Sequence, residues 1–139
     1  MPLPNGGYGL GLVARMAPKG RLLFGYFFGP RSDTLAFDLA SIEAADAALV
    51  GRFGDLHLYD GKWKTLGQVP DWDRSNWPLP LFLKRDPLGR LPDQVVCYDE
   101  DDLSRPGIWE RRDSIPQGIP TDGLMGAGYV EIALGKALD

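Results

Sequence analysis

Residues 9–15 alternate between two faces with the period of two that is typical of β-strands. One face of residues 9–15 carries Leu10, Leu12 and Ala14. Residues 22–28 are apolar at nearly every position and rich in aromatic side chains, as expected of a strand that is buried on both faces. A five-residue connection that contains Pro18 and Gly20 separates the two runs. We therefore predict an antiparallel hairpin.

The middle of the chain offers one short helix. Ser41 is a suitable N-cap, and residues 42–48 contain four alanines and two early acidic side chains that suit the positive end of a helix. Gly51 and Gly54 limit this helix to about two turns. Residues 48–53 could instead form a strand after an even shorter helix, and the pattern does not separate these two interpretations.

The other predicted strands are short. They cover residues 62–69, 81–84, 95–98 and 108–111. Asp60 and Gly61, a strong turn pair, come directly before the first of them. Near the end of the chain, Val130, Ile132 and Leu134 alternate with their neighbours, which favours a final strand. A helix that begins at Thr121 is the alternative there.

Length and composition favour a small β-rich fold. The 139 residues fit one domain, which we place at residues 1–139. Eighteen glycines and twelve prolines favour short strands and irregular connections over long helices. We predict a mainly β fold (α+β with a minor helix) built on a bent antiparallel sheet, which either stays open or closes into a barrel.

Charge is unevenly distributed along the chain. Residues 1–85 hold ten basic and eight acidic side chains, whereas residues 86–139 hold five basic and eleven acidic ones. An acidic half argues against nucleic-acid binding, which needs a basic surface to displace counterions. It is compatible with a basic protein partner, because complementary fields steer association. Solubility alone is the simpler explanation of the same charge.

The chain has no feature of a membrane or secreted protein. Its longest apolar run, Leu22 to Gly29, is far shorter than the roughly 20 residues of a membrane helix. The N-terminus lacks the basic and apolar regions of a signal peptide. Cys97 has no intrachain partner, so a reducing compartment is expected. We predict a soluble cytoplasmic protein without membrane contact.

Residues suited to catalysis are few and scattered. His57 is the only histidine, no motif surrounds it, and it is predicted to be a surface or half-buried side chain. Cys97 lies in an apolar run and is predicted to be a buried structural thiol. An enzyme would have to use His57, Glu131 or the acidic residues 99–102, and no two of these belong to one motif. We therefore predict a non-catalytic protein that needs no cofactor.

The densest charge run is a candidate contact surface for a partner. It consists of Asp99, Glu100, Asp101 and Asp102. Calcium loops take side chains from alternate positions and need a glycine at the sixth position, and this run of consecutive acids has neither feature. We therefore predict no metal site here, but a solvated acidic loop that could meet basic residues of a protein.

Tryptophans are the second candidate for partner contact. Trp72, Trp77 and Trp109 lie in or near proline-rich segments and could be lids of the core or anchors of an interface. We retain Trp72 and Trp77 as candidate partner-binding residues beside the acidic run.

Several short segments resemble the immunity protein 26 family. They are residues 2–13 (PLPNGGYGLGLV), residues 61–67 (GKWKTLG), Trp77 to Pro80 with Phe82, Asp122 to Leu124, Gly126, and Gly128 to Glu131. Family members usually carry an extra stretch with an apolar strand before the Pro-Leu-Pro segment, whereas Met1 directly precedes Pro2 here. Either the start is truncated or an edge strand is absent.

The resemblance implies a mainly β domain of a bacterial polymorphic toxin system that binds and neutralises a cognate toxin without catalysis. It supplies no catalytic residue. The alternatives are a small enzyme of unknown reaction and a structural domain that associates with itself through an exposed strand edge.

Overall fold

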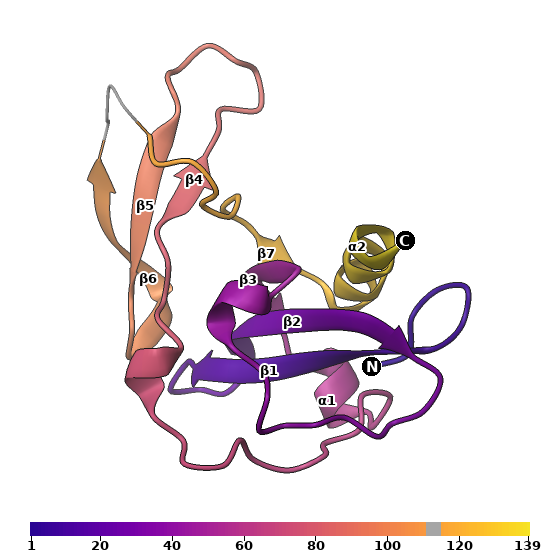
Figure 1. The fold of residues 1–139 in the computed structure, drawn as a ribbon. Coiled ribbons are helices and arrows are strands. Elements are labelled where there is room, and N and C mark those ends of the chain that lie inside the picture. The colour runs from indigo at the N-terminus through magenta and orange to yellow at the C-terminus, as the bar shows by residue number, and fades with distance from the viewer. Residues whose placement is uncertain (111–114) are drawn as a thin grey trace.

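The protein folds into two β-sheets and a C-terminal helix (Figure 1). The structure, a computed structural model, describes residues 1–110 and 115–139. The first sheet has the order β1-β2-β3-β7 and the second the order β4-β5-β6. The strands are β1 (Tyr8–Met16), β2 (Leu22–Ser32), β3 (Leu49–Gly54), β4 (Phe82–Lys84), β5 (Gln94–Asp99), β6 (Asp102–Glu110) and β7 (Leu124–Met125). The helical elements are η1 (Ala44–Asp46), α1 (Leu56–Tyr59), η2 (Arg74–Asn76) and α2 (Ala127–Leu138).

The predicted mainly β class is confirmed, but the sheet does not close into a barrel. Throughout the described chain the two sheets remain separate, and β1 and β7 form the edges of the first. In Figure 1 the second sheet rises as an arm from one end of the first sheet, and α2 lies at the other end. No helix in the described ranges is long and apolar enough to cross a membrane.

The predicted hairpin is confirmed, and β2 is the central strand of the fold. β1 and β2 pair antiparallel with Leu12 opposite Tyr26, and β2 pairs antiparallel with β3 on its other side. Alternate side chains of β2 enter two different apolar cores, which explains why this strand is apolar on both faces. Phe24 and Phe28 enter the core between the two sheets, whereas Leu23 and Phe27 enter the core beneath α2.

The predictions for residues 42–53 and for three short strands gave mixed results. Only one helical turn, η1, forms in the predicted helix 42–48, and β3 follows it, so the alternative interpretation of a strand at 48–53 is confirmed. The strands predicted at 81–84 and 95–98 are β4 and β5. The strand predicted at 108–111 overlaps β6, and its last residue lies outside the described residues.

Two predicted strands are wrong. Residues 62–69 form an irregular connection between α1 and η2. The alternation at residues 130–134 belongs to α2, whose buried positions include Ala127, Val130 and Leu134. This spacing of three and four residues is the helical period, and it places one face of α2 on the core that Leu23 and Phe27 share.

Candidate functional site

The predicted acidic run forms the tight turn between β5 and β6, where Asp99 pairs with Asp102. The side chains of Glu100 and Asp101 are 53% and 86% exposed, so both carboxylates reach solvent. Asp102 is less exposed and accepts hydrogen bonds from the backbone and hydroxyl of Ser104, which hold the pKa of its carboxyl below the usual value. The turn therefore presents a cluster of carboxylates, of which those of Glu100 and Asp101 are the most exposed to solvent.

Three arginines contact this acidic turn. Arg15 at the end of β1 is buried and places Nη2 at 3.0 Å from Oε1 of Glu100. Arg74 in η2 contacts Asp101 at 3.3 Å and Glu100 at 3.6 Å. Arg105 contacts Asp102 at 3.2 Å. These ion pairs fix the turn against β1 and η2, two elements far from it in the sequence.

The two candidate tryptophans flank η2, whose Arg74 contacts the same turn. Trp72 is 45% exposed, and its ring stacks on Trp77 with an interplanar angle of 6° and a centroid distance of 6.3 Å. Trp77 is 3% exposed and packs edge-on against Tyr26 and Phe28 in the core between the sheets. Only Trp72 of this pair therefore offers a ring surface to a partner, and Trp77 supports it from below.

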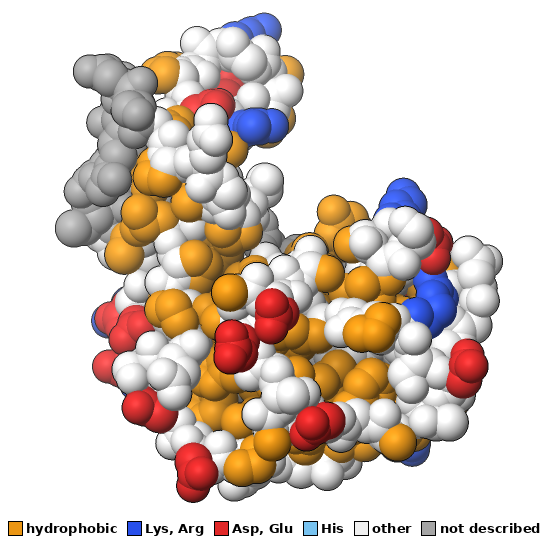
Figure 2. All heavy atoms as spheres, in the orientation of Figure 1, with side chains coloured by type: hydrophobic (Ala, Val, Ile, Leu, Met, Phe, Trp, Pro, Cys, Tyr) orange, Lys and Arg blue, Asp and Glu red, His pale blue; other side chains and the backbone are white. Residues whose placement is uncertain are grey.

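Arg74 lies between the two tryptophans in the sequence and contacts the acidic turn, so both groups of candidate residues form one surface. We call it the acid–tryptophan surface. It comprises Asp71, Trp72, Asp73, Arg74, Asp99, Glu100, Asp101 and Asp102. Figure 2 shows acidic side chains gathered at the lower left margin, where Figure 1 places the β5–β6 turn. The side chain of Trp109, which the sequence analysis considered together with Trp72 and Trp77, lies outside the described part of the chain.

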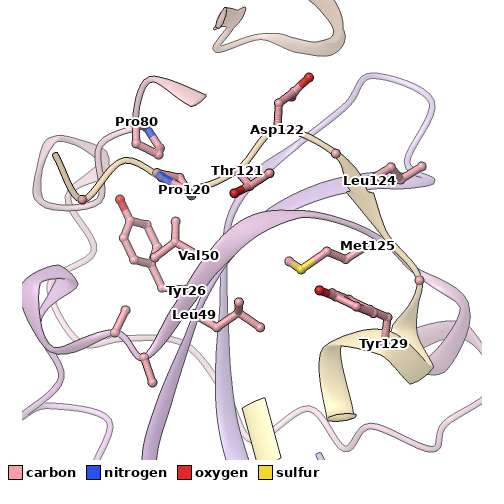
Figure 3. Close-up of a pocket in the computed structure, with 15 residues that line it drawn as sticks. Tyr26, Leu49, Val50, Pro80, Pro120, Thr121, Asp122, Leu124, Met125 and Tyr129 are labelled. Carbon is pink, nitrogen blue, oxygen red and sulfur yellow. The ribbon is translucent and has the colours of Figure 1, made fainter. Parts of the chain in front are cut away.

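A groove of about 800 Å³ lies where the chain passes from the second sheet to the first (Figure 3). Met125 and Tyr129 point into it from β7 and α2, opposite Tyr26 and Val50. The segment beside it is fixed to β4, because Leu83 donates its N–H to Pro120 and accepts the N–H of Asp122. The groove is thus built mainly of apolar side chains.

Asp122 is the only charged residue among the described residues that line this groove, and its charge is compensated. Oδ1 of Asp122 lies 3.4 Å from Nη2 of Arg52 and accepts a 2.5 Å hydrogen bond from the hydroxyl of Tyr98. The Arg52 guanidinium also lies over the Tyr98 ring, 3.9 Å from its centroid. Burial and the bond to Asp122 raise the pKa of Tyr98 to about 12. These contacts join β3 to β5 through Asp122.

The structure brings His57 and Glu131 together, although no sequence motif joins them. Glu131 is 8% exposed and accepts hydrogen bonds from the indole of Trp63 at 2.9 Å and from Lys62 at 3.1 Å. His57 is half-buried as predicted, with Nδ1 3.1 Å from Asp60 and Nε2 3.9 Å from Glu131. This arrangement links α2 to the segment that follows α1.

The remaining chemical candidates do not converge. Cys97 is exposed, contrary to the predicted buried thiol, because Val96 and Tyr98 occupy the inward face of β5 and the residue between them points outward. Among residues 1–110 and 115–139, no group of three or more metal-ligating side chains is placed to hold an ion.

Sequence reasoning identified the acidic turn and the tryptophans, but it missed the arginines that bind them. Arg15 and Arg74 lie 85 and 26 residues from Glu100 along the chain. No local motif links residues so far apart. The only available signal was the placement of Arg74 between two tryptophans.

Comparison with known proteins supports the family resemblance. The family model described as immunity protein 26 matches residues 1–91, which cover β1 to β4 together with Trp63, Trp72 and Trp77. The acidic turn and α2 lie beyond the matched range. No curated protein and no solved structure matches the chain. Because the match covers more than half of the sequence, the chain belongs to the immunity protein 26 family.

Proposed function

We propose that this protein binds one toxin domain of a bacterial polymorphic toxin system in the cytoplasm and neutralises it without catalysis. The observation that carries the proposal is the match of residues 1–91 to the immunity protein 26 family. Such a protein acts by occupying its partner, so its function depends on a contact surface and not on an active site.

The acid–tryptophan surface is the contact surface that we favour. Asp71 and Asp73 are exposed and form no ion pair within the described residues, and Asp101 keeps most of its surface in contact with solvent. Interface hot spots are enriched in tryptophan, and Trp72 presents an aromatic face among these acids. This combination fits a basic protein partner, in which lysine or arginine side chains would meet the carboxylates.

Nucleic acid and membrane fit this surface poorly. Both phosphate backbones and anionic lipid headgroups are negatively charged, so a surface rich in carboxylates repels them. A small enzyme is the rival hypothesis. It would need convergent polar groups in a cavity, whereas Asp122, the one charged side chain described in the lining of the groove in Figure 3, is already paired with Arg52.

Co-expression with the toxin domain encoded by the adjacent gene tests the proposal. We expect cells to survive the toxin and the two proteins to purify together in equal amounts. Survival lost in spite of soluble immunity protein would overturn the proposal. Titration of purified toxin then separates binding from catalysis, because a binding protein protects only in equimolar amount, whereas an enzyme would inactivate many toxin molecules per copy.

A further inference from the structure

A second groove, of about 580 Å³, runs along the outer edge of β1. Four consecutive residues of β1, Leu10 to Val13, line it. Consecutive side chains of a strand point to opposite faces, so a groove that touches all four must approach β1 from its edge. β1 is the edge strand of the first sheet, and this edge faces the groove instead of another strand.

Hydrogen bonds and close contacts show which backbone N–H and C=O groups of β1 point toward β2 and which point toward the groove. Gly9 donates its N–H to the Met1 carbonyl at 2.9 Å and accepts from the Met1 amine at 2.8 Å, so the polar groups of Gly9 point away from β2. The Leu12 carbonyl points toward β2, because it lies 2.7 Å from the position that a Cβ on Gly25 would occupy. Since direction alternates along a strand, Gly11 and Val13 point outward like Gly9.

The N–H and C=O groups of Gly11 and Val13 are therefore unpaired on the outer side. No backbone hydrogen bond within the described ranges reaches them from another loop or turn. The N-terminal segment pairs with this edge at Tyr8 and Gly9, and the Met1 side chain also reaches Gly11, where its Cε lies 3.1 Å from the position that a Cβ would occupy. No backbone group of Met1 pairs with Gly11 or Val13, and there the edge opens to the groove. An exposed edge of this kind is a template for one more strand.

The walls of the groove are apolar. Apart from β1, they include Leu39, Ile42, Leu58, Leu66, Val69 and Trp72. Val13, Leu66 and Trp72 are 38%, 41% and 45% exposed, so a substantial apolar surface stays in contact with water. An added strand would cover this surface with every second side chain, because alternate side chains share one face.

Exposed acids flank the lining residues of this groove in the sequence, and we call them the acidic rim. Four exposed acids are direct chain neighbours of residues that line it, and none forms an ion pair with another described residue. They are Asp38, Glu43, Asp71 and Asp73. Among the described residues of the lining, Lys64 is the only cation. At the end of β1, Arg15 holds Glu100, so the acidic turn continues the same rim.

We propose that this edge binds an extended segment of the partner, in which apolar residues alternate with lysine or arginine. The segment adds a strand to β1 through Gly11 and Val13, its apolar side chains fill the groove, and its cations meet the acidic rim. The identity of that partner as a toxin rests on the function proposed above. The groove of Figure 3 is the weaker candidate for docking a basic segment. Asp122, the charged residue described in its lining, is already paired with Arg52.

Amide hydrogen exchange followed by NMR tests the added strand directly. Two probes are used with the full chain, namely the toxin domain from the adjacent gene and a synthetic peptide that alternates valine and lysine. We expect either probe to slow exchange at Gly11 and Val13 by at least tenfold. The amide of Leu12, already paired with β2, serves as the internal control. A peptide that alternates valine and glutamate should have no effect.

A pair of variants tests the same hydrogen bonds by mutation. Val13→Pro removes an outward N–H and keeps the pairing with β2, since proline is tolerated where an edge N–H faces solvent. Val13→Thr keeps both the N–H and the branched side chain. We expect Val13→Pro to weaken binding of the toxin domain at least tenfold and Val13→Thr to weaken it less than threefold. Equal affinities of the two variants would overturn the proposal.

The outcomes separate this inference from the proposed function. If the toxin domain binds but leaves Gly11 and Val13 unprotected, the edge is not the docking site, although the immunity function stands. If the peptide protects both amides and the toxin does not bind, the docking edge stands and the proposed partner is wrong. Protection that appears without either probe, and grows with protein concentration, would show that a second copy of this chain occupies the edge and would overturn the proposal.

Discussion

Trp63 and Glu131 meet in the core beneath α2, where the indole Nε1 donates a 2.9 Å hydrogen bond to Oε1 of the carboxylate. Both side chains are nearly inaccessible to solvent. The bond joins the segment after α1 to the C-terminal helix across 68 residues of sequence. Glu131 thus acts as a structural acceptor, and its charge is compensated by Lys62 at 3.1 Å.

Glu131→Ala should lower the free energy of unfolding by about 1–3 kcal/mol, because the buried Trp63 N–H would lose its acceptor. Glu131→Gln keeps an acceptor oxygen and should retain most of the stability. Glu131→Gln also removes the ion pair with Lys62, but this pair contributes little to stability because the Lys62 side chain is half exposed. Urea denaturation of both variants, with the exposed Lys136→Gln as control, checks this. An equal loss for Ala and Gln would mean that charge, not the hydrogen bond, stabilises the contact.

The close packing of β1 on β2 gives a second prediction. A Cβ on Gly25 would lie 2.7 Å from the Leu12 carbonyl and 2.8 Å from the Phe53 ring, whereas a Cβ on Gly54 would meet nothing within 4 Å. Gly25→Ala should therefore destabilise the protein by about 1–3 kcal/mol through overpacking. Gly54→Ala, in the same sheet, is the matched control and should change stability little. Thermal unfolding of the two variants distinguishes the packing effect from a general effect of replacing glycine.

Local signals were sufficient to predict the hairpin and the short strands of the second sheet. The period of two, the turn residues and the doubly apolar run at 22–28 are all properties of neighbouring residues. The same local reasoning failed at α2. Val130, Ile132 and Leu134 alternate over a short window, but Ile132 is 48% exposed while Val130 and Leu134 are buried. The strand period of two and the helical period of about 3.6 can be distinguished here only from the packing of α2 on the core beneath it.

The strand prediction for residues 62–69 failed for a different reason. Trp63 is held in the core by Glu131, and the residues after it line the groove along β1 without pairing to any strand. The acidic turn could be located from the sequence, since it lies between two predicted strands. Its contacts with Arg15 and Arg74 could not, because they depend on how the second sheet packs against β1.

Tyr98 provides a prediction about pH. Its pKa is raised to about 12, chiefly by burial and then by the bond to Asp122, from an ordinary value of 10.0. A raised pKa in the folded state means that the stabilisation is complete below pH 10 and is lost as the pH rises toward 12. Tyr98→Phe should therefore show a shallower loss of stability between pH 10 and 12.

Chemical denaturation across that interval, with the exposed Tyr59→Phe as control, measures the difference. Burial also raises the pKa of Tyr26, so a smaller slope should remain in the Tyr98 variant. Identical slopes for the Tyr98 variant and the unmodified protein would show that Tyr98 does not hold its proton more tightly when folded.

Two neighbouring acids of the β5–β6 turn should differ in their effect on stability. Glu100 pairs with Arg15, whose side chain is only 4% exposed, whereas Asp101 pairs with the half-exposed Arg74. Glu100→Ala leaves a buried guanidinium without its carboxylate and should cost about 1–3 kcal/mol. Asp101→Asn should stay within about 0.5 kcal/mol, as expected of a surface substitution. Equal urea midpoints for the two variants would contradict the structural role of Arg15.

The last prediction concerns how the acid–tryptophan surface recruits its partner. Asp101→Asn combined with Asp99→Asn should slow association with the toxin domain several-fold, because fewer charges would steer the encounter. The fold should be retained, since the Asp99 side-chain oxygen that accepts the Asp101 N–H at 2.8 Å is also present in asparagine. Dissociation should change little, because exposed charges act mainly on the approach of the two proteins.

Asp101→Asn alone should also slow association, and Asp33→Asn, which removes one negative charge in the same way, is its matched control. Asp33 is exposed and follows Ser32, which pairs with Tyr8 at the end of β1 opposite to Arg15. Both changes alter the net charge equally, so an equal effect on association would mean that only overall charge matters and that this surface is not the contact. The local effect should also fade with added salt, since screening limits the reach of exposed charges to about 8 Å at physiological ionic strength. Stopped-flow association measured at low and high salt therefore distinguishes steering by this surface from a general electrostatic effect.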